Sequence, residues 1–499
     1  MGTAASRRRS SPGLRWRSRS SSSRSCLLPS YRRVTPRCPA RRPPTRVERR
    51  RTRARRPNRP RSPSAAVAAH ALIDPLASLF LGLAATSLIG VPLYAGSVRG
   101  RAYALFGFVI LLLSLPGAIV MHERLLAWFV PGTARLANAA FVYSMAAGGV
   151  HLASLVRPRL RGPGFRFLVS IPGMAFIAAG ALSGIWLLAL LPLRAVLAAL
   201  DWHRALATLR WLDLVPFVVA ALSIGTSLRV AREVVRIRLA GPEDDGPARV
   251  MRVPLERYRR RSPSPLPSRP LRVVQISDPH LGPWQSVAAL RRRIAELCAH
   301  DPDLVLLTGD FLTMEGRGTP GALAEALAPL RSLAGRTFAI LGNHDHEALE
   351  EVTGGLASNR IRLLVDEEAV ARTPVGLVQL IGANYVGRGR KEHLERLLAS
   401  HPRREDHLRM LLLHDPSGFR FVPRGDVDLT LSGHTHGGQL GLVSFGLDWT
   451  VLARSAWPDH GLFGHGRNRL YVHRGTGFYG FPLRIGVPGE ASLLELVFD

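Results

Sequence analysis

The chain has 499 residues and a formal net charge of +31, too long for a single domain of roughly 100–200 residues. The charge is concentrated at one end, because 21 arginines and a single acid, Glu48, lie in residues 1–70, so the total is no evidence for a nucleic-acid partner. Three cysteines, two of them in that same segment and Cys298 in an expected helix, exclude a disulfide framework or a cysteine zinc site.

Residues 1–70 are rich in Arg, Ser and Pro, with runs such as SRSSSSRS and RRRTRARRPNRPRSPS. They contain too few apolar residues to offset chain entropy, so a disordered tail is predicted. A solvated basic tail at a membrane surface is the favoured explanation, and a start codon assigned upstream of the true one is the second. A nucleic-acid-binding arm has least support, because no aromatic residues are interleaved to stack on bases.

Residues 71–230 carry successive apolar spans, each close to the ~20 residues that cross a bilayer core of ~30 Å. They predict an integral membrane protein with an all-α transmembrane region of five helices. Four helices is the alternative, because the last span has Asp213 and Pro216 near its start. A transporter-like role is disfavoured, since ionisable groups that would mark a pathway are almost absent from the spans. The spans cover about 75–95, 102–121, 136–156, 167–193 and 211–228.

The loops between the spans indicate an orientation. Loops on the side of the C-terminal part carry more arginines, among them Arg157, Arg159 and Arg161, than the loops on the other side. The positive-inside rule then places the C-terminal domain in the cytoplasm, at the inner membrane of a bacterium. The basic tail opposes this orientation, and we give it less weight because a start codon assigned upstream of the true one would remove it from the protein.

The remaining chain divides into a Pro- and charge-rich linker at 231–268 and an α/β domain at 269–499. In the second part, β-rich runs alternate with helical stretches such as SVAALRRRIAELCAH and KEHLERLLASH. This alternation predicts layered α/β architecture with ligands bound where strands end.

Five apolar runs of this domain end in side chains that can bind metal: VVQISDPH, LVLLTGD, AILGNHD, LLLHDP and LSGHTHGG. Any one of these fragments is more often an ordinary turn or a structural histidine. Five in succession at predicted strand ends indicate a metal centre. Mixed carboxylate and imidazole ligands suit Mn, Fe or Zn better than Mg or Ca. Two ions need a bridging carboxylate, which a lone Asp at a Gly-Asp turn can supply. The residues are Asp278, His280, Asp310, Asn343, His344, Asp345, His414, His434 and His436.

In this order the fragments D-x-H, G-D, G-N-H-D, a lone H and G-H-T-H resemble the calcineurin-like metallophosphoesterases. The longer SGHTHGGQ, preceded by membrane segments, is most similar to the bacterial membrane-anchored branch of that family. The resemblance covers about residues 270–499 and implies a four-layer αββα sandwich. It implies that His344 acts beside the leaving group as general acid or charge stabiliser, oriented by Asp345. It also implies a first metal held by Asp278, His280, Asp310 and His436, and a second held by Asp310, Asn343, His414 and His434.

The implied reaction is hydrolysis of a phosphoester or pyrophosphate bond by a metal-activated hydroxide. Many relatives carry an acid shortly after the Gly-Asp turn, where this chain has Phe311, Leu312 and Thr313, but that position is not a ligand. Relatives in this branch cleave UDP-2,3-diacylglucosamine on the way to lipid A, which makes a lipid-linked pyrophosphate the specific substrate expected. A general phosphodiesterase or phosphomonoesterase, and a metal-binding receptor without turnover, are the alternatives.

Overall fold

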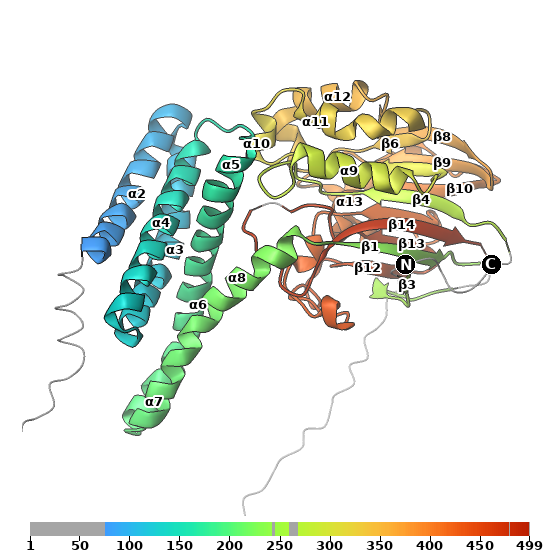
Figure 1. Ribbon diagram of the computed structural model, residues 1–499. Helices are drawn as coiled ribbons and strands as arrows, with labels where there is room; N and C mark the ends of the chain where they lie inside the picture. Colours follow the sequence, from blue (N-terminus) through green and yellow to red (C-terminus); the bar gives the residue numbers. More distant parts are fainter. Residues whose placement is uncertain (1–74, 242–244, 259–267, 479, 499) are drawn as a thin grey trace, which may run out of the picture. The chain divides into compact units, whose positions relative to one another are not determined.

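The computed structural model describes residues 75–241, 245–258, 268–478 and 480–498. The predicted basic tail at 1–70 lies outside these residues. The described chain consists of a helical region followed by a mixed α/β domain with two sheets (Figure 1).

The helical region exposes large apolar side chains on its outer surface. Leu93, Leu105 and Leu222 are 68%, 63% and 69% exposed, which is the pattern of helices that face lipid. Among the residues that the structure describes, five helical spans are long and apolar enough to cross a membrane, which is the expected number. The elements are α2 (Pro75–Arg99), α3 (Arg101–Trp128), α4 (Pro131–Ser154), α5 (Pro163–Phe165), η1 (Arg166–Ser170), α6 (Ile171–Ala199), α7 (His203–Leu209), η2 (Arg210–Leu214) and α8 (Val215–Leu228).

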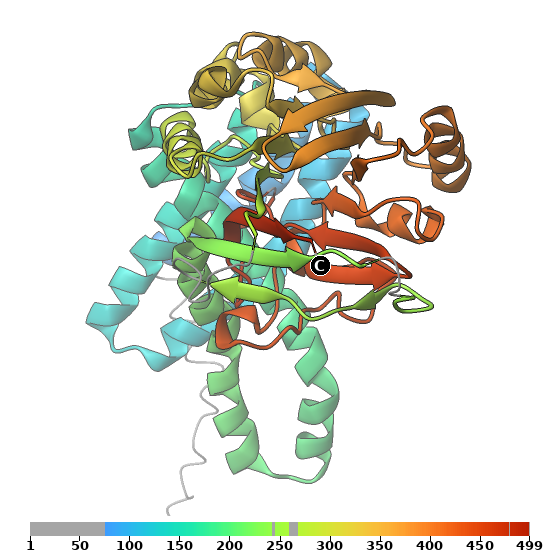
Figure 2. The same ribbon diagram turned by 90° about the vertical axis from the view of Figure 1, so that its right-hand side faces the viewer.

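Small residues allow close packing within this region. Helix α3 meets α6 where a Cβ on Gly117 would overlap the backbone of Gly180 and Gly184, so only glycine fits. Helices α6 and α7–α8 run beside each other as a hairpin (Figure 2). Asp213, which made the last span uncertain, is fully buried and pairs with Arg124 and Arg194. This pairing explains how a charged residue is accommodated at the start of that span.

Two seven-stranded sheets form the centre of the α/β domain. The first has the order β3-β1-β14-β4-β5-β6-β7, and the second has the order β2-β12-β13-β11-β10-β9-β8. Strands β4 to β7 run parallel in the first sheet, and β9, β10, β11 and β13 run parallel in the second. The strands are β1 (Val230–Arg238), β2 (Met251–Arg252), β3 (Glu256–Tyr258), β4 (Leu271–Ile276), β5 (Leu304–Leu307), β6 (Thr337–Ala339), β7 (Arg362–Leu363), β8 (Glu367–Thr373), β9 (Gly376–Gly382), β10 (His407–Leu412), β11 (Leu429–Ser432), β12 (Gly461–His465), β13 (Asn468–Val472) and β14 (Gly489–Val497).

Three apolar clusters give the domain its layers. One cluster fills the space between the sheets, a second joins the first sheet to α9, α11 and α12, and a third joins the second sheet to α13. Figure 1 shows α9, α11 and α12 together on one side of the sheets. The order helix, sheet, sheet, helix is the expected αββα sandwich. The helices are α9 (Val287–Cys298), α10 (Met314–Arg317), α11 (Ala322–Leu327), η3 (Ala328–Leu333), η4 (Asp345–Ala348), α12 (Leu349–Ala357), α13 (Arg390–Ser400), η5 (Pro416–Phe421), η6 (His436–Gly438) and η7 (Val443–Phe445).

The segment 231–268, expected to be a linker, contributes strands to both sheets instead. Strand β1 pairs with β14 in parallel from Val230–Gly489 to Arg238–Val497, and β2 pairs with β12. One of the charged residues that favoured a linker is buried in β1 and paired inside the fold. Arg236 is 4% exposed and lies 3.4 Å from Glu495 Oε2, so a charged residue occupies a buried strand position.

The helical region touches the α/β domain through specific hydrogen bonds. The Ser223 hydroxyl in α8 donates to Pro482 O at 2.6 Å, and the Ser227 hydroxyl accepts from Arg484 N at 3.1 Å. The loop after α4 contributes Leu160, whose N–H donates to the Thr319 hydroxyl at 2.7 Å. The loops that follow the parallel strands therefore lie beside the apolar helices.

Candidate metal centre

The predicted metal-binding side chains all follow strands of the two sheets. Strands β4, β5 and β6 of the first sheet precede Asp278, Asp310 and Asn343, and strands β10 and β11 of the second precede His414 and His434. Carboxyl ends of parallel strands gather at one edge of a sheet. The structure brings the predicted residues into two adjoining clusters at this edge.

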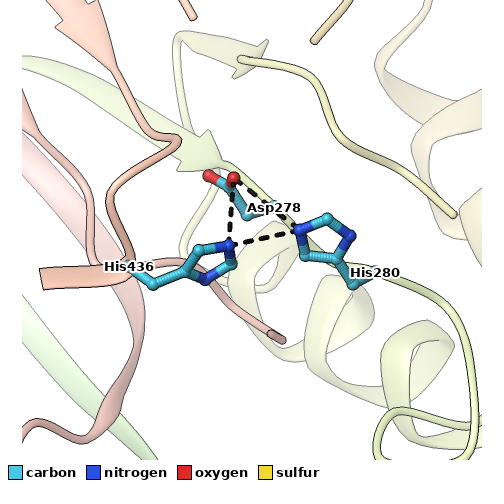
Figure 3. A group of neighbouring side chains, drawn as sticks. All are labelled: Asp278, His280 and His436. Carbon is cyan, nitrogen blue, oxygen red and sulfur yellow. Dashed lines mark hydrogen bonds and ion pairs between the residues drawn. The ribbon is translucent and has the colours of Figure 1, made fainter. Parts of the chain in front are cut away.

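The first cluster contains Asp278, His280 and His436 (Figure 3). His280 Nε2 lies 3.2 Å from His436 Nε2, and the two nitrogens lie 3.9 Å and 3.5 Å from Asp278 Oδ1. All three side chains are buried. Two imidazole nitrogens and a carboxylate oxygen therefore converge on one position.

The second cluster contains Asp310, His414 and His434, with Asn343 beside them. Asn343 Oδ1 lies 3.2 Å from His414 Nε2 and 2.9 Å from His434 Nδ1. Asp310 Oδ2 lies 3.3 Å from His414 Nε2 and 3.8 Å from His280 Nε2 in the first cluster. The Asp310 carboxylate thus stands between the two clusters.

The backbone is strained at these positions. Asp278, His280, Asp310, His434 and His436 adopt positive φ angles of 48°, 42°, 60°, 70° and 52°. Non-glycine residues seldom adopt this conformation, which costs about 1–3 kcal/mol each and tends to gather at functional sites. Five such residues on three loops that meet at one place indicate that the fold maintains their geometry against this cost.

Hydrogen bonds from the surrounding chain orient the candidate ligands. His414 Nδ1 lies 2.7 Å from Thr308 O, which fixes Nδ1 as the protonated nitrogen and directs Nε2 to the cluster. The Asp278 carboxylate accepts the hydroxyl proton of Ser277 and the backbone N–H of His434. These hydrogen bonds fix the orientation of the candidate ligands, as the partners of metal ligands commonly do.

The pKa values of the clustered side chains are consistent with a site for two divalent cations. Burial lowers the pKa of His280 to about 3 and that of His434 to about 4, so both rings are neutral at pH 7. Burial raises the pKa of Asp278 to about 7, a penalty that an adjacent cation would remove. Burial would also lower the pKa of His414, but Asp310 raises it to about 10. A cation between Asp310 and His414 would replace the proton that they otherwise share.

Comparison with known proteins agrees with this geometry. Residues 271–438 match the family model described as calcineurin-like phosphoesterase. A phosphodiesterase of Escherichia coli K12, YaeI, is 30% identical over 233 residues, which are 46% of this chain and 83% of that protein. The chain belongs to the calcineurin-like phosphoesterase family. It is accordingly a metal-dependent hydrolase with two candidate metal sites.

Other calcineurin-like phosphoesterases match a smaller share of their own length. An uncharacterized metallophosphoesterase of Campylobacter jejuni, Cj0846, is 29% identical over 45% of this chain and 59% of its own. A bovine protein named transmembrane protein with metallophosphoesterase domain is 27% identical over 45% of this chain and 53% of its own. This chain therefore spans little more than half of these two relatives.

The structure places the expected general acid, His344, at the edge of this calcineurin-like site. Its ring centroid lies 5.7 Å from that of His280, and its backbone N–H donates to Asp310 Oδ1 at 2.8 Å. Asp345 accepts from the backbone N–H groups of Asp310, Phe311 and Gly342 at 2.7–2.8 Å. Asp345 thus ties two ligand loops together, and its predicted pairing with the His344 ring stays a prediction.

Sequence reasoning missed Arg317, whose NH2 group lies 3.2 Å from His344 Nδ1. Arg317 follows Asp310 in the chain, but only the short helix α10 turns it back toward His344, so no spacing signal predicts the contact. Glu347 accepts a hydrogen bond from Arg317 and lies 3.4 Å from the same His344 nitrogen.

Three further residues next to the ligands were not predicted. Asp415, adjacent to His414 in the LLLHDP fragment, has Oδ2 3.8 Å from His434 Nε2, and its place in that fragment was an available signal. The Tyr385 ring lies 6.2 Å from that of His414. Arg484, 1% exposed, donates to Gly477 O at 2.6 Å and has NH2 3.3 Å from His436 Nδ1. The last two come from distant segments, which the sequence does not place.

Proposed function

We propose that this chain is a membrane-anchored phosphoesterase that uses two divalent ions to hydrolyse phosphoester or pyrophosphate bonds. The position of Asp310 carries the proposal, because its Oδ2 stands 3.8 Å from His280 Nε2 and 3.3 Å from His414 Nε2. A carboxylate shared by two ligand sets is the requirement of two-metal hydrolases, whose ions lie about 3.5–4 Å apart. In this assignment Asp278, His280, Asp310 and His436 hold one ion, and Asp310, Asn343, His414 and His434 hold the other.

The two ions would activate water for attack on phosphorus and offset the charge of the phosphoryl oxygens. The protein's own acid would be His344. Arg317 NH2 lies 3.2 Å from His344 Nδ1, closer than the Glu347 carboxylate at 3.4 Å, so we assign the tautomer in which Nδ1 accepts from Arg317 and the ring proton is on Nε2. His344 Nε2–H is then available to the leaving-group oxygen. Mn, Fe or Zn are the proposed ions, because imidazole and carboxylate ligands are mixed.

The first substrates to test are phosphodiesters, because the E. coli relative carries the name phosphodiesterase. A lipid-linked pyrophosphate such as UDP-2,3-diacylglucosamine is the more specific candidate, supported by the apolar spans that hold the site beside a bilayer. General phosphomonoester hydrolysis is the competing activity, and metal binding without turnover is the competing class.

One experiment separates these functions. Full-length protein in detergent, supplied in turn with Mn²⁺, Fe²⁺ or Zn²⁺, is assayed on bis(4-nitrophenyl) phosphate, 4-nitrophenyl phosphate and UDP-2,3-diacylglucosamine. We expect metal-dependent hydrolysis of at least one of these, with the diester preferred over the monoester. Bound metal without turnover on any of them would support the non-catalytic receptor and reject the proposed function.

A further inference from the structure

A cavity of about 310 Å³ lies between the membrane helices and the phosphoesterase loops. Helices α3, α4 and α6 contribute one wall, with Phe106, Leu152 and Met174. The phosphoesterase domain contributes the other, with Trp284 and Phe478, whose rings lie 5.5 Å apart. Ligand pockets have volumes of about 300–1,000 Å³, and this cavity is at the lower end of that range. Its size therefore suits one apolar chain better than a larger ligand.

The phosphoesterase wall of the cavity belongs to the loops that carry the metal ligands. Trp284 follows His280 and Thr313 follows Asp310 in the chain, and the Thr313 N–H donates to Leu281 O at 3.2 Å. Phe478 follows Gly477, whose N–H donates to Asp278 O at 3.0 Å. An occupant of the cavity would therefore lie next to the metal centre.

The helical wall of the cavity reaches the lipid-facing surface. Phe106 lines the cavity and is 51% exposed on α3, one of the candidate membrane spans. Ile110 lines the cavity further along the same helix. A hydrocarbon chain in the bilayer can reach the cavity past Phe106 without crossing water, where its exposure would be unfavourable.

Two titratable side chains, His151 and Glu315, interrupt this apolar lining. His151 is 2% exposed, and among the described residues its Nδ1 has no hydrogen-bond partner. Glu315 accepts a hydrogen bond from Thr313 at 2.9 Å, and burial raises its pKa. An unpaired buried nitrogen costs free energy, so an occupant with one hydrogen-bonding group, such as an ester or amide, fits better than a plain hydrocarbon.

A second cavity of about 210 Å³ shares Pro283 and Glu315 with the first and is lined by Arg159, Arg161 and Arg166. Three guanidinium groups beside an apolar cavity complement an acyl chain with an anionic headgroup. We propose that the larger cavity binds one acyl chain of the substrate, so that the enzyme takes anionic lipid phosphoesters from the bilayer. This inference rests on the proposed phosphoesterase function and adds the substrate class and the place of its chain.

The test uses full-length protein in detergent with 4-nitrophenyl methyl phosphate and 4-nitrophenyl dodecyl phosphate, which differ only in chain length. We expect the dodecyl ester to have at least a tenfold higher kcat/KM. Ile110→Trp should reduce this ratio at least fivefold by filling the cavity. Leu113→Trp, on the same helix but 62% exposed and outside the cavity lining, is the matched control and should keep the ratio.

A ratio near one in the wild type, or equal losses in the two variants, would overturn the acyl site while leaving the phosphoesterase proposal intact. A lack of hydrolysis of both esters, and of every substrate tested for the proposed function, would instead reject that function. Photolabelling tests the acyl site without turnover. The probe is phosphatidic acid with a diazirine on its acyl chain, and the protein is the His434→Ala variant, which should not hydrolyse it. Labels on Met174, Trp284 or Phe478 support the site, and labels confined to outward positions such as Leu113 overturn it.

Discussion

His280 Nε2 lies 3.2 Å from His436 Nε2, although the two residues are 156 positions apart in the chain. Both residues adopt positive φ angles, and their rings stack at a centroid distance of 5.1 Å. Two neutral imidazole nitrogens that face each other beside Asp278 lie where a cation would be bound by all three. The folded chain therefore maintains strained backbone to hold the histidines in this arrangement.

Replacing Asp310 by Ala should remove activity and one or both metal ions, because its carboxylate stands between the two clusters. His434→Ala should weaken chiefly the second site. The fall in activity of Asp310→Ala should exceed the roughly 10–100-fold change that follows removal of a residue hydrogen-bonded to a metal ligand. Metal content by plasma mass spectrometry and hydrolysis of bis(4-nitrophenyl) phosphate measure both effects. His300→Ala, at an exposed position, is the control, and wild-type turnover in Asp310→Ala would contradict the assignment.

His344→Ala should keep both metal ions yet lower kcat by about 10²–10⁴-fold, the usual contribution of a general acid. The loss should be smaller for a substrate with a 4-nitrophenolate leaving group, which needs less protonation than an alkoxide. Arg317→Ala should show the same dependence on leaving group more weakly, because Arg317 acts through His344. An equal loss for good and poor leaving groups would argue that His344 serves the fold and not proton transfer.

Gly433→Ala should abolish metal binding, since a Cβ at this position would overlap Ser277 Oγ and Asp278 Oδ2. Gly354→Ala in α12 is the matched control, because a Cβ there meets no atom within 4 Å. Alanine at a helix position such as 354 should add roughly 0.5–1 kcal/mol of stability. Thermal unfolding and metal content distinguish the two, and tight metal binding by Gly433→Ala would show that the loop can rearrange.

The free energy of unfolding should fall as the pH is lowered, because the protein buries a neutral histidine outside the metal clusters. His473 is fully buried, its Nδ1 accepts from Gly475 N–H at 3.0 Å, and burial lowers its pKa to about 4. The unfolded side chain, with a pKa near 6.5, binds a proton first, so acidification from about pH 6.5 to pH 4 favours unfolding by up to ~1.4 kcal/mol per pH unit. In metal-loaded protein, the unfolding temperature of His473→Gln should fall less steeply between pH 6.5 and pH 4 than that of the wild type. An unchanged slope would show that other groups cause it.

The loop arginines predict a cytoplasmic phosphoesterase domain. Green fluorescent protein fused after residue 499 should fluoresce, and alkaline phosphatase fused there should be inactive. A fusion after Leu200, between α6 and α7, should give the opposite pair of results, because this loop lies at the other end of the helices. Active alkaline phosphatase at residue 499 would place the domain outside the cytoplasm.

Much of the site was predictable because its signals are local. Asp310 and His434 each follow a short apolar run, and buried parallel strands of this kind end at one sheet edge. Arg317 and Arg484 were not predictable, because their contacts with His344 and His436 depend on how separate loops turn back on the domain. The segment 231–268 was wrongly predicted as a linker because Arg236 is neutralised by Glu495, a partner from the far end of the chain.

The sequence alone determined the apolar spans, the layered α/β architecture and the set of candidate ligands. Each depends on hydrophobic periodicity or on residues that immediately follow a strand, and both are properties of short stretches of chain. Only the tertiary structure decided that Asp310 stands between the two clusters and that Trp284 and Phe478 meet α3, α4 and α6 in one cavity. These relationships join segments far apart in the chain, and burial and packing of the whole fold set their distances.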